Sequence, residues 1–268
     1  MKTLVADCGA TKAEWYVSGG EHFTTEGISF SQTSPARREE ILREAASKAG
    51  AGIRRVFFYA AGLVGESPVD LREFFSGAQV EYASDLLGAA RAVCGHREGI
   101  AAILGTGAAT CQWDGEKPVR QIPSGGFILG DEGSASALGR LFVADFLKGL
   151  VPEEMDQAFG MQFPRAYKDL VEKVYRSDAP ARFLGSTAPL VLDFCLKGNA
   201  YATKLVTENF RAFFERTVLR YDRLPLGIVG GFGYAARDIL QQTAASYGIQ
   251  ITTIEPSPME ALVKYHGL

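Results

Sequence analysis

Short apolar runs separated by glycine turns fill the first part of the chain. Residues 3–6 and 13–17 are mainly apolar, and residues 22–26 form a more polar run of similar length. Gly9 separates the first two runs, and Gly19 and Gly20 separate the second from the third. Apolar runs of this length bounded by glycine turns are typical of strands joined by tight connections. The pattern therefore predicts a three-stranded meander.

Helical spacing follows the meander. Ser34 and Pro35 are a pair that often caps and opens a helix, and apolar residues recur at positions 41, 42, 45, 46 and 49. Strand and helix patterns then alternate. We expect a strand at 56–59, a short helix at 68–75, a strand at 80–83 and a helix at 85–94. The predicted order over this part of the chain is βββαβαβα.

The same order begins again near residue 100. We expect strands at 100–104, 108–113 and 119–122, then a long helical stretch at about 133–221 whose last helix has an apolar face. The tail predicts a strand at 226–229, a helix at 234–247, a strand at 249–254 and a helix from 257. This internal repeat predicts two α/β domains, 1–104 and 105–268, that face each other across a cleft.

Composition and charge narrow the function classes. The 268 residues are 47% hydrophobic and 22% charged, which excludes a disordered chain. With 28 basic and 31 acidic residues, the chain lacks the basic excess of nucleic-acid-binding proteins, so we expect no nucleic-acid partner. The uncharged stretches are too short to cross a bilayer and the start lacks a signal-peptide pattern, so we expect no membrane partner and a cytoplasmic protein. The four cysteines and three histidines show no zinc-ligand spacing.

Two glycine turns at equivalent points of the repeat are candidate phosphate sites. Asp7 ends the first strand and is followed by Gly9, Thr11 and Lys12, so that a carboxylate, a hydroxyl, an ammonium and backbone N–H groups come together. That set suits a phosphate and its Mg²⁺, although a plain turn with an exposed lysine is the alternative. Gly105-Thr106-Gly107 occupies the equivalent turn of the second half. Their equivalence favours a phosphate cleft.

Two acidic positions are candidates for contact with a second substrate. Asp85 opens the helix at 85–94, where it is either a first-turn carboxylate that stabilises the helix or a general base at the carboxyl end of a strand. Asp131 and Glu132 lie in the glycine-rich segment 125–134, just before a predicted helix. They either cap that helix or bind a polar ligand.

A third glycine cluster follows the strand at 226–229. Gly230-Gly231-Phe232-Gly233 begins a G-x-G-x-x-A pattern, with Glu255 at the end of the next strand. The pattern is typical of dinucleotide-binding folds, but the further strands of such a half are missing. The alternative is a turn that lets a flat adenine lie against the backbone. The sequence contains no G-x-x-x-x-G-K-[ST], which excludes a Walker-type NTPase.

These motifs together resemble the BadF/BadG/BcrA/BcrD ATPase family, and within it the N-acetylglucosamine kinase-like members of the sugar-kinase, actin and heat-shock-chaperone superfamily. Asp7-Cys8-Gly9-Ala10-Thr11-Lys12 resembles the first phosphate motif, Gly105-Thr106-Gly107 the second and Gly230-Gly231-Phe232-Gly233 the adenosine motif. Ser84-Asp85-Leu86 resembles the segment that carries the catalytic base, and Gly130-Asp131-Glu132-Gly133-Ser134 matches the family pattern. The sequence departs from the family at Ser29, where an asparagine contacts the sugar, and in a shorter loop before Gly130.

The resemblance implies two ribonuclease H-like (actin-like ATPase) domains around a central cleft, with ATP and Mg²⁺ as cofactors and a small sugar as substrate. It implies that Asp85 is the catalytic base, that Asp7 holds the metal and that Gly230 and Gly231 contact adenosine. Gly9, Thr11, Lys12, Gly105, Thr106 and Gly107 would bind phosphates. Ser29, Gly126, Phe127 and Asp131 would contact the sugar. We expect an ATP-dependent kinase of N-acetylglucosamine or a related amino sugar, and leave a homodimer open.

Two other functions share the resemblance. One is a non-kinase ATPase that activates an iron–sulfur dehydratase, for which Cys94 and Cys111 would be the candidate thiolate ligands. The other is a nucleotide-dependent sugar sensor that binds its ligands without turnover. Neither function requires a base at Asp85.

Overall fold

The computed structural model describes residues 2–30, 33–63 and 65–268, which form two compact units. Unit 1 comprises Met1–Arg97, Asp114–Pro118 and Ser257–Leu268, and unit 2 comprises Glu98–Trp113 and Val119–Pro256. The units therefore differ from two continuous halves, because the C-terminal residues group with unit 1. Strand β6 (Gly99–Leu104) groups with unit 2, since it pairs with strands of that unit on both sides.

Unit 1 is built on a five-stranded sheet in the order β3-β2-β1-β4-β5. Its strands are β1 (Lys2–Cys8), β2 (Lys12–Val17), β3 (Glu21–Glu26), β4 (Ile53–Ala60) and β5 (Gln79–Ser84). The first three pair antiparallel, as the predicted meander requires, and β4 and β5 run parallel to β1. The predicted order βββαβαβα is confirmed except at one short helix.

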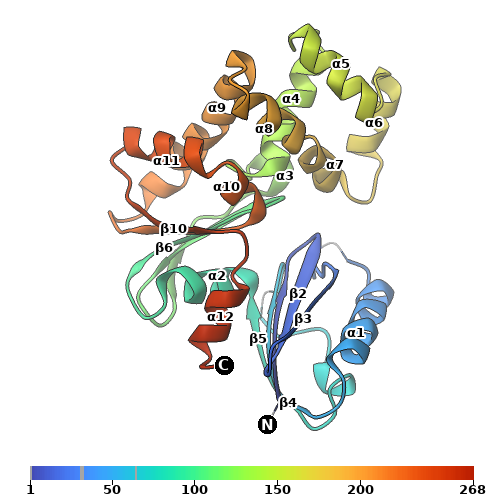
Figure 1. Cartoon of the computed structure of the whole chain (residues 1–268), viewed down its shortest axis with the longest axis vertical. Coiled ribbons are helices and arrows are strands. Elements are labelled where there is room, and N and C mark those ends of the chain that lie inside the picture. The colour runs from blue at the N-terminus through green and yellow to red at the C-terminus, as the bar shows by residue number, and fades with distance from the viewer. Residues whose placement is uncertain (1, 31–32, 64) are drawn as a thin grey trace. The chain divides into compact units, whose positions relative to one another are not determined.

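Alternation along β1 decides which side of the sheet each residue faces. Leu4 and Ala6 pack into a core with helix α1 (Pro35–Ala49), whose N-cap is the predicted Ser34. Val5 packs on the other side with helix α12 (Met259–Tyr265). In Figure 1 helix α2 (Asp85–Cys94) and α12 lie near one another. Asp7 lies two residues beyond Val5, so it belongs to the α12 side.

The expected helix at 68–75 is wrong. The structure has only a short 3₁₀ turn, η1 (Leu71–Glu73), in this segment. Asp70 accepts a hydrogen bond from the Arg72 N–H at 3.0 Å, and the Leu71 N–H donates to the Tyr82 hydroxyl at 2.7 Å. These bonds satisfy the backbone locally without a continued helix, because short polar side chains compete for backbone N–H groups.

Unit 2 repeats the strand order of unit 1. Its sheet runs β10-β9-β6-β7-β8, with strands β7 (Ala108–Trp113), β8 (Pro118–Gln121), β9 (Leu226–Val229) and β10 (Ile251–Glu255). Again the first two strands pair antiparallel, and the fourth and fifth run parallel to the first. The predicted internal repeat is therefore confirmed as two sheets of the same topology.

Helices lie on one side of the second sheet (Figure 1). They are α3 (Gly126–Leu129), α4 (Ala135–Phe146), α5 (Glu153–Gln162), α6 (Tyr167–Tyr175), α7 (Pro180–Ser186), α8 (Ala188–Leu196), α9 (Ala200–Arg216), the 3₁₀ turn η2 (Val218–Arg220), α10 (Gly231–Ala235) and α11 (Arg237–Ser246). Of these, α5 and α6 pack on other helices and lie farther from the strands (Figure 1). The predicted apolar face of α9 is buried and includes Phe210, Phe213 and Phe214. The expected helix at 234–247 is confirmed over Arg237–Ser246 as α11, but it does not continue back to Tyr234, because the chain breaks at Ala236 and residues 234 and 235 belong to α10.

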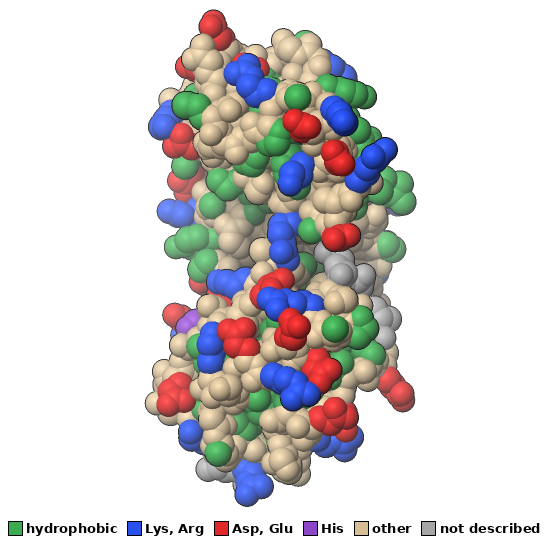
Figure 2. Space-filling view, turned by 90° about the vertical axis from the view of Figure 1, so that its right-hand side faces the viewer, with side chains coloured by type: hydrophobic (Ala, Val, Ile, Leu, Met, Phe, Trp, Pro, Cys, Tyr) green, Lys and Arg blue, Asp and Glu red, His purple; other side chains and the backbone are tan. Residues whose placement is uncertain are grey.

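The surface charge and the composition of the helices bear on the partners of the protein. Acidic and basic side chains are interspersed over the face drawn in Figure 2. Among the described residues, none of the helices has both the length and the apolar composition needed to cross a bilayer.

Candidate functional site

The turn between β1 and β2 packs tightly on a neighbouring backbone segment. The Gly9 N–H donates to the Lys12 carbonyl at 3.1 Å, and the Gly27 N–H donates to the Thr11 carbonyl at 3.0 Å. A Cβ atom at Gly27 would lie 2.3 Å from the Gly9 carbonyl oxygen. A side chain at position 27 would therefore displace the turn that carries the predicted phosphate-binding residues.

Asp7 lies directly before this turn, opposite Glu14 in the β1–β2 register. Burial, with the charges of Asp85 and Glu14, raises the pKa of Asp7 to about 7, against the opposing charge of Lys12. A carboxylate held this way is partly protonated at neutral pH, and a bound cation would favour its ionised form. Asp7 and Asp85 are thus close enough to interact electrostatically.

Glu14 is a residue of this cluster that the motif analysis missed. Its carboxylate accepts hydrogen bonds from the Lys12 ammonium and the Ser257 hydroxyl, and His22 Nε2 lies at 4.0 Å. Burial alone would raise the pKa of Glu14, but these hydrogen bonds outweigh it and lower the pKa. The available signal was its position, since it interrupts an apolar strand directly opposite Asp7.

Asp85 is the first residue of α2, at the carboxyl end of β5. The N-cap is its neighbour Ser84, whose hydroxyl accepts the Leu87 N–H at 3.2 Å. Asp85 is therefore not needed as the cap. One of its oxygens accepts the Leu86 N–H at 2.9 Å, and burial raises its pKa to about 6.

Ser29 lies in the segment that follows β3. It forms a parallel bridge with Ala61, and the Ala61 N–H in turn donates to the Cys8 carbonyl at 2.8 Å. The Ser29 N–H donates to the Thr33 hydroxyl at 3.0 Å, and Ser29 itself is buried. The segment is thus tied to the end of β1, next to the turn at 9–11.

Unit 2 gathers its own glycine motifs at the end of β6. The Gly105 and Thr106 carbonyls accept the Ala135 and Ser136 N–H groups at 2.9 and 3.0 Å, so the first turn of α4 holds this turn. A Cβ atom at Gly230 would lie 2.4 Å from the Leu104 carbonyl oxygen. The predicted second phosphate motif and the predicted adenosine motif are therefore in direct contact.

Two glycines of this cluster border open space. A Cβ atom at Gly105 or at Gly231 would meet no atom within 4 Å. Glycine at such positions lets a ligand approach the backbone closely. The arrangement fits a nucleotide that lies along the backbone of both the turn at 105–107 and the segment at 230–233.

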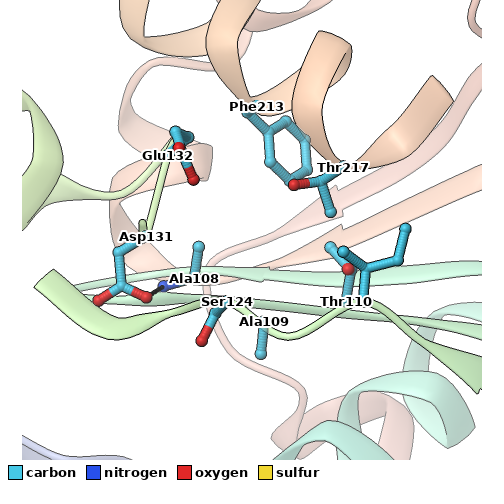
Figure 3. Close-up of a pocket in the computed structure, with 9 residues that line it drawn as sticks. Ala108, Ala109, Thr110, Ser124, Asp131, Glu132, Phe213 and Thr217 are labelled. Carbon is cyan, nitrogen blue, oxygen red and sulfur yellow. Dashed lines mark hydrogen bonds between the residues drawn. The ribbon is translucent and has the colours of Figure 1, made fainter. Parts of the chain in front are cut away.

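Asp131 adds a carboxylate to the turn at 105–107. One oxygen accepts the Ala108 N–H at 3.3 Å, and a Cβ atom at Gly107 would lie 3.1 Å from the other oxygen. Asp131 is 8% exposed, and burial raises its pKa. Figure 3 shows Asp131 beside Ala108, with Phe213 on the α9 side of a small pocket.

The pocket beside Asp131 is small. Its volume of about 10 Å³ has room for about one water molecule. Among the other predicted sugar contacts, Gly126 begins α3 with a φ of 68°, and Phe127 is partly buried against the unit 2 core. The structure thus brings Asp131 to the second phosphate motif and Phe127 to the core beneath α3.

The chemistry of these donors fits Mg²⁺ and ATP. Mg²⁺ in phosphate-transfer sites is held by one or two carboxylates, with phosphate oxygens and water as the other ligands. Asp7 offers one such carboxylate, and the described residues contain no cluster of three or more metal-ligating side chains. Gly105 and Gly231 border open space in which a polyphosphate could approach the backbone closely.

Comparison with known proteins gave matches among solved structures, and no protein-family model or curated protein matched the chain. A provisionally assigned N-acetylglucosamine kinase from Porphyromonas gingivalis aligns with a TM-score of 0.86 and 35% identity over 98% of both chains. A second such protein, from Chromobacterium violaceum, aligns with a TM-score of 0.71 and 19% identity over 98% of both chains.

A third match has the same fold at lower identity. The ROK family glucokinase of Streptomyces griseus, solved in complex with glucose and AMPPNP, aligns with a TM-score of 0.58 and 16% identity over 99% of this chain and 98% of the other. At this identity the likeness concerns the fold, which is the two-domain, actin-like ATPase fold. With 35% identity over nearly all of both chains, the chain belongs to the N-acetylglucosamine kinase-like family of the Porphyromonas gingivalis protein.

Proposed function

We propose that the protein transfers the γ-phosphoryl group of ATP to a hydroxyl of N-acetylglucosamine or a related amino sugar, as a BadF/BadG-type kinase. The observation that carries the proposal is the position of the Asp85 carboxylate. It stands at the carboxyl end of β5, near Asp7, and Ser84 caps the helix in its place. Its pKa of about 6 suits a general base that works near neutral pH.

The phosphates would be held mainly by the backbone. The Gly9 and Gly105 N–H groups are bonded within their turns, so other N–H groups of residues 9–11 and 105–107 would be directed at phosphate oxygens, and Lys12 would add a cation. Gly230 and Gly231 would lie against the adenosine. When bound, magnesium and ATP supply the phosphoryl group and neutralise part of its charge. Asp7 would hold the metal, directly or through water.

The acceptor would be placed by Asp85 and Asp131. Asp85 accepts the proton of the attacking hydroxyl, and Asp131, with Ser29, Gly126 and Phe127, contacts the sugar. The chemical step needs little covalent work from the protein, because positioning and charge stabilisation provide most of the catalysis of phosphoryl transfer.

A coupled assay of ADP formation over a panel of amino sugars and hexoses tests this proposal. We expect magnesium-dependent turnover that is highest with an N-acetylated amino sugar. ADP release without phosphorylation of any sugar would instead identify a non-kinase ATPase, and binding without ADP release would identify a sensor. Either result would overturn the proposed function.

A further inference from the structure

Three residues on one face of α9 contact the loop that carries Asp131. Asn209, Phe213 and Arg216 follow one another at intervals of four and three residues, which places them on the same face of the helix. They contact the loop at residues 132–134. The proposed chemistry uses none of these contacts.

Both the oxygen and the nitrogen of the Asn209 side-chain amide are hydrogen-bonded to the loop. Its Oδ1 accepts the Gly133 N–H at 3.0 Å, and its Nδ2 donates to the Ser134 carbonyl at 3.0 Å. Asn209 is 2% exposed, and the other buried residues of α9 are apolar. A buried amide is costly unless it is hydrogen-bonded, and here both bonds go to the loop backbone.

Phe213 and Arg216 support the same segment. Gly133 has a φ of 84°, and a Cβ atom there would lie 2.8 Å from the Phe213 side chain, so the ring side of α9 presses on the loop backbone. Arg216 Nη1 donates to Glu132 Oε1 at 2.9 Å. The helix therefore contacts three consecutive residues directly after Asp131.

This support matters because Asp131 has an unusual backbone conformation. Its φ is 56°, and among the described residues no other non-glycine has a positive φ. Such a conformation persists where the surroundings hold it firmly. The Ser134 N–H donates to the Asp131 carbonyl at 3.0 Å, and the Asp131 N–H donates to the Ser124 carbonyl at 2.9 Å. Ser134 thus links Asn209 to Asp131.

We propose that Asn209 is a positioning residue for the acceptor substrate. Through Gly133 and Ser134 it fixes the backbone of Asp131, and hence the direction of the Asp131 carboxylate. Asn209 itself touches no reactant. The inference rests on the proposed function in one respect, namely that Asp131 contacts the acceptor.

Asn209→Asp is the sharpest variant, because it keeps the shape of the side chain. A protonated carboxyl can accept from the Gly133 N–H and donate to the Ser134 carbonyl, as the amide does. An ionised carboxylate cannot donate and repels that carbonyl. At pH 8 we expect the KM for N-acetylglucosamine to rise about tenfold or more, as slight misplacement of a reactant contact does, with the KM for ATP within about twofold.

Lowering the pH should restore the variant. Burial raises the pKa of a carboxyl, so the introduced group regains its proton in mildly acidic buffer. Asp131 and Glu132 are the charged groups of the loop, Arg140 and Arg216 are the charged groups that act on them, and wild-type protein measured in parallel corrects for their titration. The ratio of variant to wild-type kcat/KM should therefore recover between pH 8 and pH 6. A ratio that does not change with pH would overturn the proposal.

The matched control is Asn199→Asp. Asn199 is the only other asparagine of the chain and caps the same helix, where aspartate is an equally good cap. This control loses the exposed hydrogen bond from Asn199 Nδ2 to Glu154 but keeps the cap, so it should leave the KM of N-acetylglucosamine within about twofold of wild type. If Asn209→Asp does not fold, Phe213→Leu should show the same separation of the two KM values at a smaller size, about threefold, by loosening the same contact.

Amide hydrogen exchange tests, without any substrate, whether the two hydrogen bonds of Asn209 hold the loop; we call this pair of bonds to Gly133 and Ser134 the clamp. In Asn209→Asp at pH 8, residues 131–134 should exchange faster than in Asn199→Asp, and unchanged exchange there would overturn the proposal. Wild-type protein that phosphorylates no sugar would count against the proposed function instead, and the exchange result would still decide the role of Asn209.

Discussion

The two units have the same strand order, but they bring charge to their glycine turns in different ways. In unit 1 the turn at 9–11 is flanked by Asp7 on β1 and by Lys12 and Glu14 on β2. In unit 2 the turn at 105–107 has uncharged strand residues on both sides. Its carboxylate comes from Asp131, on a different loop, which accepts the Ala108 N–H.

Under the proposed function, this difference would give the two turns separate tasks. Unit 1 places two carboxylates and an ammonium within a few residues, which suits a metal and the reacting end of a polyphosphate. Unit 2 offers mainly backbone N–H groups and open glycine faces at Gly105 and Gly231, which suits close contact along a nucleotide. A duplicated topology can thus carry two kinds of phosphate contact.

The largest effect should come from unit 1, at Asp85. Asp85→Asn retains an oxygen for the Leu86 N–H but cannot accept a proton, so kcat for the sugar should fall by about 10² to 10⁴. The free energy of unfolding should change by less than about 1 kcal/mol, because Ser84 keeps the cap. Steady-state kinetics and thermal unfolding check both statements. Near wild-type kcat would remove Asp85 as the base and make Asp131 the next candidate.

Unit 2 should respond through nucleotide affinity instead. Gly231→Ala adds a methyl group to open space, so we expect the KM for ATP to rise about tenfold, equivalent to about 1.4 kcal/mol, with unchanged stability. Gly230→Ala is the matched variant, because its φ is 125° and its Cβ would press on Leu104. It should lose about 1–3 kcal/mol of stability as well. Equal stability losses in both variants would argue against a ligand at Gly231.

The same contrast explains how much of the site the sequence predicts. The meander, the helix at 85–94 and the glycine turns follow from local patterns, because each depends on neighbouring residues. Asp7 and Lys12 could be singled out for the same reason. The pattern over Pro68–Phe75 predicts a helix that does not form, because Asp70 and Tyr82 bind the backbone there and only one 3₁₀ turn results.

The rest depends on contacts between distant segments. The bond from Asp131 to Ala108 and the clamp of Asn209 on Gly133 join residues that are far apart in the chain. In the sequence, Asn209 is one polar residue in an apolar helix face, a pattern with many structural explanations. Glu14 is intermediate, since only the β1–β2 register places it opposite Asp7.

A smaller effect concerns Asp7 of unit 1 and the dependence of the free energy of unfolding on pH. The pKa of Asp7 rises from 3.8 to about 7 on folding, so the folded state holds the proton more tightly than the unfolded chain. This contribution to stability is fully present below about pH 4 and is lost as the pH rises towards 7. Asp7→Asn should therefore flatten the decrease in unfolding free energy between pH 4 and pH 7, as urea titrations at several pH values would measure. An unchanged slope would contradict the raised pKa.

The smallest effect should come from Glu14, whose charge opposes phosphate binding while holding Lys12. Glu14→Gln keeps the size of the side chain and one oxygen that can accept from Lys12, its NH2 group can donate to the Ser257 hydroxyl, and the negative charge is removed. The KM for ATP should fall by about two- to fivefold, because one unit charge at about 4 Å is worth about 1 kcal/mol in a water-like medium. His22→Gln is the control, since it changes the more distant partner of the same carboxylate. A rise of the KM for ATP would show instead that the charge of Glu14 is needed to hold Lys12 in place for the phosphates. Phosphate binding by unit 1 would then depend on the Lys12–Glu14 ion pair, whereas in unit 2 it would depend on the backbone.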